Sequence, residues 1–255
     1  MTSGQHNVAL VTGGARRIGR AIALGLAHAG WDIAVHYGNS KDDANVTVAA
    51  IQALGRRAVA LQCDLADADA TALLMERAQA TLGWVSCLVN NASIFEFDDT
   101  ASFSAALLER HVRINLSAPI LLARSLHANV PPGGEAVVIN LLDQKLYNLN
   151  PDFMSYTLSK AGLQCATTML AQTLAPTVRV VGIAPGITLV SGDQSNDGFE
   201  QAHARTPLGR SSTAEDIAAT VCFVAASKAI TGTTLVVDGG QHLVPLPRDV
   251  MFLTT

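Results

Sequence analysis

The sequence contains few charged residues, and they are not concentrated anywhere. Charged residues make up 15% of the 255 residues, the formal net charge is -4, and no block of like charge occurs. A protein that binds nucleic acid or an anionic membrane electrostatically needs a basic patch or stripe. Nucleic acid and membrane are therefore disfavoured as partners.

Cysteine is also scarce, and its spacing is uninformative for metal binding. The four cysteines lie far apart without a CxxC pair, so neither a zinc site nor a disulfide framework is expected. We expect all four to be buried as small apolar side chains. They are Cys63, Cys87, Cys165 and Cys222.

Long apolar runs are absent as well. No stretch of about 18 apolar residues, the length of a membrane helix, occurs. The polar lead MTSGQHN has neither the basic nor the apolar region of a signal peptide. These features predict a cytoplasmic protein.

Hydrophobic residues, at 49%, are abundant enough for a large core, and their pattern alternates between strand and helix. The alternation predicts one α/β domain over residues 1–255, with a parallel sheet covered on both faces. The expected strands are residues 8–12, 31–37, 58–63, 87–91, 135–141, 178–183 and 233–239. The expected helices are residues 17–29, 41–54, 67–82, 102–128, 152–175 and 214–226. Gly30 and Gly55 fit helix C-termini, and Asp67 fits an N-cap.

Two further segments invite interpretation. Residues 187–213 are rich in Ser, Gly, Asp and Asn, which is typical either of an active-site lid or of an ordinary insertion. The segment 241–255, QHLVPLPRDVMFLTT, is apolar enough that we expect it to prefer the surface of a partner subunit.

The first strand runs into a glycine-rich turn, VALVTGGARRIG, with glycines at 13, 14 and 19. Backbone amides in such a turn and at the following helix N-terminus attract a pyrophosphate. The spacing is not GxGxxG, so an ordinary glycine turn is the alternative interpretation.

The end of the second strand bears on the choice of nucleotide. An acidic residue there selects the free 2′-hydroxyl of NAD, but the sequence has only His36, Tyr37, Gly38, Asn39 and Ser40. Arg17, with Arg16, can instead bind a 2′-phosphate. The two arginines therefore indicate NADPH, the alternative being an exposed basic first turn.

Tyr156 and Lys160 lie one turn apart in a predicted helix and so share a face. A lysine cation beside a phenol lowers the pKa of the tyrosine, which suits a general acid. The pair follows the strand ending in NLLDQ, where a nicotinamide would lie at the carboxyl edge of the sheet.

These landmarks together resemble the short-chain dehydrogenases/reductases over nearly the whole chain. The matching positions are TGxxxxxG at 12–19, Asp64, NNAS at 90–93, Asn115, Tyr156, Lys160, Pro185, Gly186 and VDGG at 237–240. The resemblance implies a doubly wound Rossmann fold with a seven-stranded parallel sheet, often tetrameric, with a cofactor half of about 1–130 and a substrate half of about 131–255. It also implies that Asn115, Tyr156 and Lys160 form a proton relay, and that Lys160 holds the nicotinamide ribose.

Asp143 stands where most members of that family carry a serine. An aspartate suits a substrate with ring N–H or amino groups and can relay a proton to a ring nitrogen; a turn-forming aspartate is the alternative. With Arg17, HYxxS at 36–40, NNASxF ending at Phe95 and PGITLV at 185–190, it makes the chain similar to the pteridine reductases. That branch usually has HYxRS, where this chain has Asn39.

The resemblance and the pattern together assign three groups of residues. The catalytic group is Asp143, Tyr156, Lys160 and Asn115, and the substrate group is Ser93, Phe95, Asp143 and Tyr156. The cofactor group is Gly13, Arg16, Arg17, Ile18, Gly19, His36, Tyr37, Asn39, Ser40, Asp64, Leu65, Asn91, Ala92, Ser93, Lys160, Pro185 and Gly186. Phe95 as ordinary core packing is the alternative to stacking on a pterin.

The function predicted from the sequence is therefore reduction of a C=N bond of a pterin or folate by NADPH, in a homotetramer without a metal. One alternative is a carbonyl or 3-ketoacyl reductase, against which Asp143 argues. A catalytically silent NADP-binding regulator is the other, against which the intact Asn115, Tyr156 and Lys160 argue.

Overall fold

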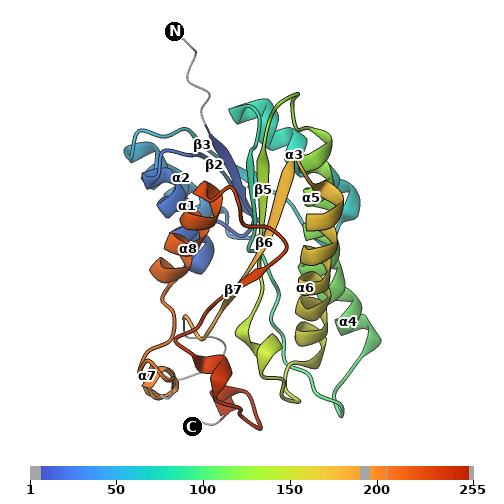
Figure 1. The fold of residues 1–255 in the computed structure, drawn as a ribbon, viewed down its shortest axis with the longest axis vertical. Helices are drawn as coiled ribbons and strands as arrows, with labels where there is room; N and C mark the ends of the chain where they lie inside the picture. The colour runs from blue at the N-terminus through green and yellow to red at the C-terminus, as the bar shows by residue number, and fades with distance from the viewer. Residues whose placement is uncertain (1–6, 190–195, 205, 253–255) are drawn as a thin grey trace.

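The computed structural model describes residues 7–189, 196–204 and 206–252. Their strands form one parallel sheet in the order β3-β2-β1-β4-β5-β6-β7 (Figure 1). The strands are β1 Val8–Val11, β2 Asp32–Tyr37, β3 Ala58–Gln62, β4 Cys87–Asn90, β5 Ala136–Leu141, β6 Val178–Pro185 and β7 Thr234–Val237. The predicted seven-stranded parallel sheet is confirmed, with strand ends shifted by one or two residues.

Helices cover both faces of the sheet. They are α1 Arg17–His28, α2 Lys41–Ala53, α3 Ala68–Leu82, α4 Ala105–Val112, α5 Ala118–Ala128, α6 Met154–Leu174, α7 Asn196–Ala204 and α8 Ala214–Ala226. In Figure 1, α1, α2 and α8 lie on one side of the sheet, while α3, α5 and α6 lie on the other. This two-sided cover confirms the doubly wound arrangement.

The structure corrects two of the expected elements. Residues 102–128 are not one helix, because α4 and α5 are joined by a π-helical turn, η1 Arg113–Ser117, which contains Asn115. Residues 187–213 are not a continuous loop either, since α7 lies within them, while residues 190–195 and 205 lie outside the described part. Single π-turns of the η1 kind are frequent at functional sites.

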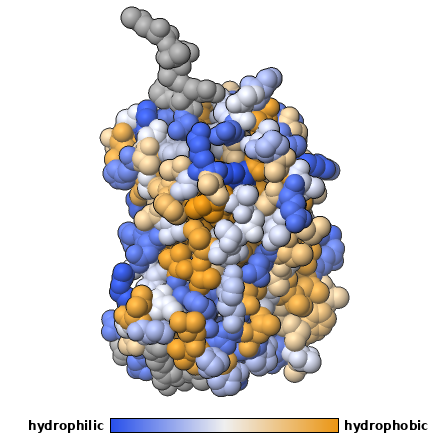
Figure 2. All heavy atoms as spheres, in the orientation of Figure 1, coloured by the Kyte–Doolittle hydropathy of each residue, from blue (hydrophilic) through white to orange (hydrophobic). Residues whose placement is uncertain are grey.

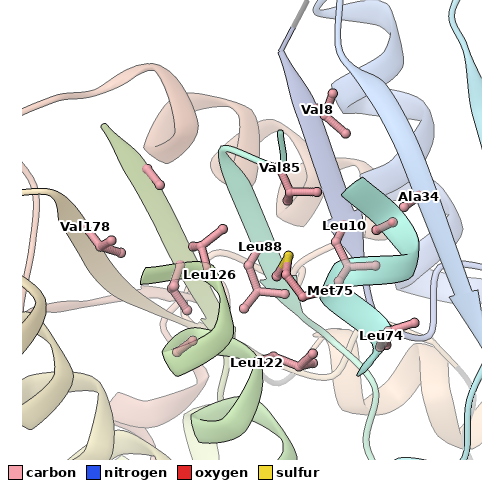
Figure 3. Close-up of a cluster of buried hydrophobic side chains, with 14 of the residues drawn as sticks. Val8, Leu10, Ala34, Leu74, Met75, Val85, Leu88, Leu122, Leu126 and Val178 are labelled. Atoms are coloured by element: carbon pink, nitrogen blue, oxygen red, sulfur yellow. The ribbon is translucent and has the colours of Figure 1, made fainter. Parts of the chain in front are cut away.

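The side chains on the two faces of the central strands pack into two separate hydrophobic cores. Leu10 of β1 lies opposite Ala34 of β2 and Leu88 of β4, and all three point into the cluster shown in Figure 3. Leu74 and Met75 of α3 also belong to that cluster. Strands that are buried on both faces explain the nearly continuous apolar runs of the sequence.

The helix-terminal predictions hold, and one cysteine prediction fails. The Asp67 carboxylate accepts hydrogen bonds from two amides of α3, and Gly30 and Gly55 have φ of +92° and +76° after α1 and α2. Cys63 and Cys87 are buried and Cys222 is half-buried, but Cys165 is exposed because it lies on the outer face of α6. All four are free thiols.

Neither a metal cluster nor a membrane helix is found in the described ranges. No group of three or more His, Cys, Asp or Glu side chains there could hold a metal ion. None of the helices there has both the length and the apolar character needed to cross a bilayer.

Adjacent leucines of α3 provide a direct test of the core. We expect Leu74→Ala to lower the free energy of unfolding by about 2–5 kcal/mol, because the fully buried side chain leaves a cavity. The matched control Leu73→Ala, at a side chain that is 54% exposed, should change it by less than about 0.5 kcal/mol. Equal losses in urea denaturation would show that the cluster of Figure 3 does not support the fold.

Candidate active site

Two adjoining cavities open where β1, β4, β5 and β6 end. The nucleotide cavity, about 420 Å³, is lined by the residues around the glycine turn and the end of β2. The catalytic cavity, about 290 Å³, is lined by the ends of β5 and β6, by α6 and by the C-terminal segment. Arg17, Ile18, Asn91 and Ser93 line both cavities.

The glycine turn has the backbone geometry of a phosphate cradle. Gly13 has φ of +61°, which favours glycine, and a Cβ at Gly19 would lie 2.1 Å from the Gly13 carbonyl oxygen. Within the described residues, no side chain caps α1, and its first turn contains no acidic residue. The amides at this helix N-terminus are therefore suited to an anion such as a pyrophosphate.

Most residues assigned to the nucleotide lie where the sequence places them. The nucleotide cavity is lined by Gly13, Arg16, Arg17, Ile18, Gly19, Tyr37, Asn39, Ser40, Asn91, Ala92 and Ser93. Arg17 has φ of +55°, and residues strained in this way cluster at ligand sites. Asp64 and Leu65 do not line the cavity: the Asp64 carboxylate accepts from the Ala66 amide, and Leu65 is buried.

His36 differs from its assignment because it is buried and lines neither cavity. Its Nδ1 accepts a hydrogen bond from the Gly13 amide at 3.0 Å, so its Nε2, 3.1 Å from the Cys63 carbonyl oxygen, is the protonated nitrogen. Burial lowers the pKa of His36 to about 4. His36 is therefore a neutral support for the glycine turn.

The catalytic cavity is built around a hydrogen bond between Asp143 and Tyr156. The Tyr156 hydroxyl donates to Oδ2 of Asp143 at 2.7 Å, and the Lys145 amide donates to Oδ1 at 2.8 Å. Burial raises the pKa of Asp143, and burial together with the nearby Asp143 charge raises the pKa of Tyr156 well above its ordinary value. The pKa values of both groups are thus shifted upward.

Lys160 lies beside this pair but does not act on it as the sequence predicts. Its Nζ donates to the Leu141 carbonyl oxygen at 2.7 Å and lies 5.8 Å from the centre of the Tyr156 ring. Burial lowers the pKa of Lys160 to about 8. The expectation that the pKa of Tyr156 is lowered is wrong for this structure, because burial and the Asp143 charge raise it.

Asn115 connects the elements around the pair. Its Oδ1 accepts from the Ser93 hydroxyl at 3.1 Å and the Ile94 amide at 2.9 Å. Its Nδ2 donates to the Ser159 hydroxyl at 3.0 Å on α6. The side chain therefore fastens the loop after β4 to the helix that carries Tyr156, and its part in a proton relay stays a prediction.

Phe95 lines the catalytic cavity and is 40% exposed, so its interpretation as ordinary core packing is wrong. Its ring stacks on Phe153 at 4.0 Å between centroids and meets Tyr156 edge-on at 4.7 Å. Pro185 and Gly186 lie on the wall formed by the end of β6. A flat ring can thus enter the catalytic cavity between Phe95 and the hydrogen-bonded pair of Asp143 and Tyr156.

Several lining residues are absent from the sequence-based list. The Oε1 of Gln144 is buried and has no hydrogen-bond partner among the described residues. Lys145, Arg248 and Asp249 place charged groups along the lining of the cavity. Asp98, fully buried, accepts from the Ser155 amide and hydroxyl at the start of α6. Apart from Gln144, these residues have partners that are distant in sequence, so spacing alone carried no signal for them.

Comparison with known proteins identifies the family. A family model described as enoyl-(acyl carrier protein) reductase matches residues 13–242. The chain belongs to this family, within the short-chain dehydrogenases/reductases, as the fold and the Tyr156 and Lys160 landmarks indicate.

Individual relatives differ in their activities. A crystal structure of FolM alternative dihydrofolate reductase 1 from Brucella canis, complexed with NADP, is 39% identical with a TM-score of 0.88, covering 93% of this chain and 95% of that one. L-rhamnose 1-dehydrogenase (NAD(P)(+)) from Sphingomonas sp. (strain SKA58) is 32% identical, covering 92% of this chain and 95% of its own. The 3-oxoacyl-[acyl-carrier-protein] reductase FabG of Staphylococcus aureus (strain Mu50 / ATCC 700699) is 33% identical, covering 92% and 98%.

The buried His36 predicts loss of stability in acid. Because its pKa in the folded chain is about 4, below the ordinary value of 6.5, its contribution is complete above pH about 6.5 and falls as the pH drops towards 4. We expect a loss of about 2 kcal/mol between pH about 7.5 and 5 from this group. Urea denaturation at both pH values measures it.

The matched variant is His36→Asn, which keeps an acceptor near the Gly13 amide without the titrating ring. Its stability should fall by about 2 kcal/mol less than that of the wild type over the same pH interval. The same pH dependence in both proteins would contradict the assignment.

Proposed function

We propose that this protein is an NADPH-dependent reductase of a C=N bond in a pterin or folate ring. The observation that carries the proposal is the hydrogen bond between the Tyr156 hydroxyl and the Asp143 carboxyl, 2.7 Å long and facing the catalytic cavity. A hydrogen-bonded pair of acids whose pKa values are both raised by burial is suited to give a proton to a ring nitrogen. The similarity to an alternative dihydrofolate reductase supports this substrate class.

In this proposal, some residues of the catalytic cavity position the cofactor and the substrate, and others transfer a proton. NADPH, when bound, supplies the hydride that reduces the ring carbon. Tyr156 and Asp143 hold the proton that the adjacent nitrogen receives, and Lys160 holds the nicotinamide ribose. Phe95 stacks on the substrate ring, and the buried Oε1 of Gln144 offers an acceptor for its N–H groups.

NADPH rather than NADH is proposed from the residues beside the expected adenosine ribose. Tyr37, Asn39 and Ser40 line the nucleotide cavity without a carboxylate, and Arg16 and Arg17 line the same cavity. A 2′-phosphate would meet cationic donors there. Asp64 and Leu65, which contribute nothing to the cavity wall, remain predictions for the adenine end.

A carbonyl reductase is the second candidate function. The relatives that are named L-rhamnose 1-dehydrogenase and FabG favour it, since they are as long as this chain and about a third identical. Asp143 distinguishes the two functions, because a carboxyl group suits the ring N–H and amino groups of a pterin and stands where most members of the family carry a serine. The intact pair of Tyr156 and Lys160 argues against a silent regulator.

We also propose that the protein works as a cytoplasmic homotetramer. Apolar side chains gather on the face formed by α8 and β7 (Figure 2), where Phe223 is 57% exposed. β7 is one of the two edge strands of the sheet, at the end opposite β3. An apolar surface beside a sheet edge is suited to association with another copy of the chain.

Replacing Asp143 tests the proposed chemistry. Asp143→Ala should lower the rate of dihydropterin reduction about 10²–10⁴-fold, because the partner of the Tyr156 hydroxyl is removed, while NADPH still binds. Tyr156→Phe should have a similar effect. The measurement is NADPH oxidation with dihydrobiopterin, dihydrofolate and a panel of ketones, with NADH in parallel, and Kd from NADPH fluorescence.

Asp42→Ala, at an exposed carboxylate of α2, is the control and should behave as the wild type. Turnover of pterins by Asp143→Ala at the wild-type rate would overturn the role of Asp143. Turnover of ketones alone by the wild type would favour the carbonyl reductase.

A further inference from the structure

The C-terminal segment, residues 244–252, covers the catalytic cavity of its own chain. Leu246, Arg248, Asp249 and Val250 line the cavity together with Asp143 and Tyr156. The last described turn of the segment, η4 Val250–Phe252, contacts α7. The segment therefore contacts its own chain, and the expectation that it prefers the surface of a partner subunit stays a prediction.

The first anchor of this segment is a buried carboxylate that precedes α6. Asp152 is 1% exposed, and both its oxygens accept from Nε of Arg248, at 2.9 and 2.8 Å. The Asp249 amide donates to the same carboxylate at 2.7 Å. Although burial acts to raise the pKa of Asp152, the hydrogen bonds from Arg248 and Asp249 lower it, so the carboxylate is charged and paired.

The second anchor joins the segment to the residue that holds Asp143. Lys145 is 3% exposed, and its Nζ lies 2.9 Å from Oδ2 of Asp249 and also donates to Asn150. The amide of the same lysine donates to Asp143. A buried ammonium is stable only with such partners, so loss of the segment would disturb the turn beside Asp143.

The third contact is a row of aromatic rings that ends at Phe95. Phe252 stacks on Phe153 with centroids 6.0 Å apart and planes 19° apart. Phe153 in turn stacks on Phe95 at 4.0 Å and 17°. The position of the Phe95 ring, which faces the cavity, thus depends on Phe252 through Phe153.

We propose that residues 244–252 are a substrate-positioning wall, held by Arg248 on Asp152 and by Asp249 on Lys145, that fixes Phe95 and Asp143 for the substrate ring. Arg248 and Lys145 are occupied with their carboxylate partners and act as positioning residues. This inference rests on the proposed function only for the identity of the ring. The nucleotide cavity contains no residue of the segment, so the part of NADPH that binds at the glycine turn does not contact the wall.

Arg248→Met tests the wall, because it leaves Asp152 buried without its arginine. We expect KM for dihydrobiopterin to rise about tenfold, kcat to stay within about threefold, and Kd for NADPH to be unchanged. Arg248→Lys should restore part of the affinity, which a general loss of packing would not allow. Arg113→Met, which removes an exposed arginine paired with exposed Glu109, is the matched control and should leave KM unchanged.

Hydrogen exchange tests the wall without any substrate. In Arg248→Met, the amides of residues 94–97 and 143–147 should exchange at least about tenfold faster than in the wild type, while those of residues 13–19 keep their rates. Unchanged exchange at 94–97 and 143–147 would overturn the inference. Failure of the wild type to reduce dihydrobiopterin, with faster exchange in the variant, would overturn the proposed function alone.

Discussion

The hydrogen bond between Tyr156 and Asp143 joins the two parts of the chain on which the site depends. Asp143 follows β5, a strand with both neighbours in the sheet, and Tyr156 begins α6, whose first turn is fixed by the buried Asp98. Parallel strands bring their carboxyl ends to one edge, so a residue after β5 and a helix beginning nearby meet there. Removing either group would leave a buried polar atom without its partner, which is costly.

Burial controls the chemistry of this edge. It raises the pKa of both Asp143 and Tyr156, and it lowers the pKa of Lys160 to about 8 and of His36 to about 4. The same physical effect therefore raises the pKa of two acids in the catalytic cavity and keeps one histidine neutral beneath the glycine turn. The surrounding fold supplies the low-dielectric environment, and the sequence supplies the groups that respond to it.

The sequence was sufficient for the parts of the molecule that depend on local pattern. Apolar runs, the glycine turn and caps such as Asp67 follow from short-range rules, and the sheet is confirmed by the structure. Tertiary packing decides the π-turn that contains Asn115 and the ion pair of Lys145 with Asp249, so neither could be predicted from the sequence. The pKa of Tyr156 was misjudged for a related reason: the spacing reveals Lys160 as a neighbour but reveals neither the burial nor the contact with Asp143.

The most direct test of this account is the ionisation of Tyr156 itself. The chain has 3 tyrosines, so carbon-13 labelling at Cζ gives few NMR signals, and Tyr156→Phe assigns the one in the site. The account predicts that the Tyr156 signal stays at the neutral phenol position up to pH about 10, the ordinary pKa of tyrosine, and that Asp143→Ala lowers its pKa. A Tyr156 signal that titrates near pH about 7 in the wild type would contradict it, and would mean that Lys160 rather than Asp143 controls the phenol.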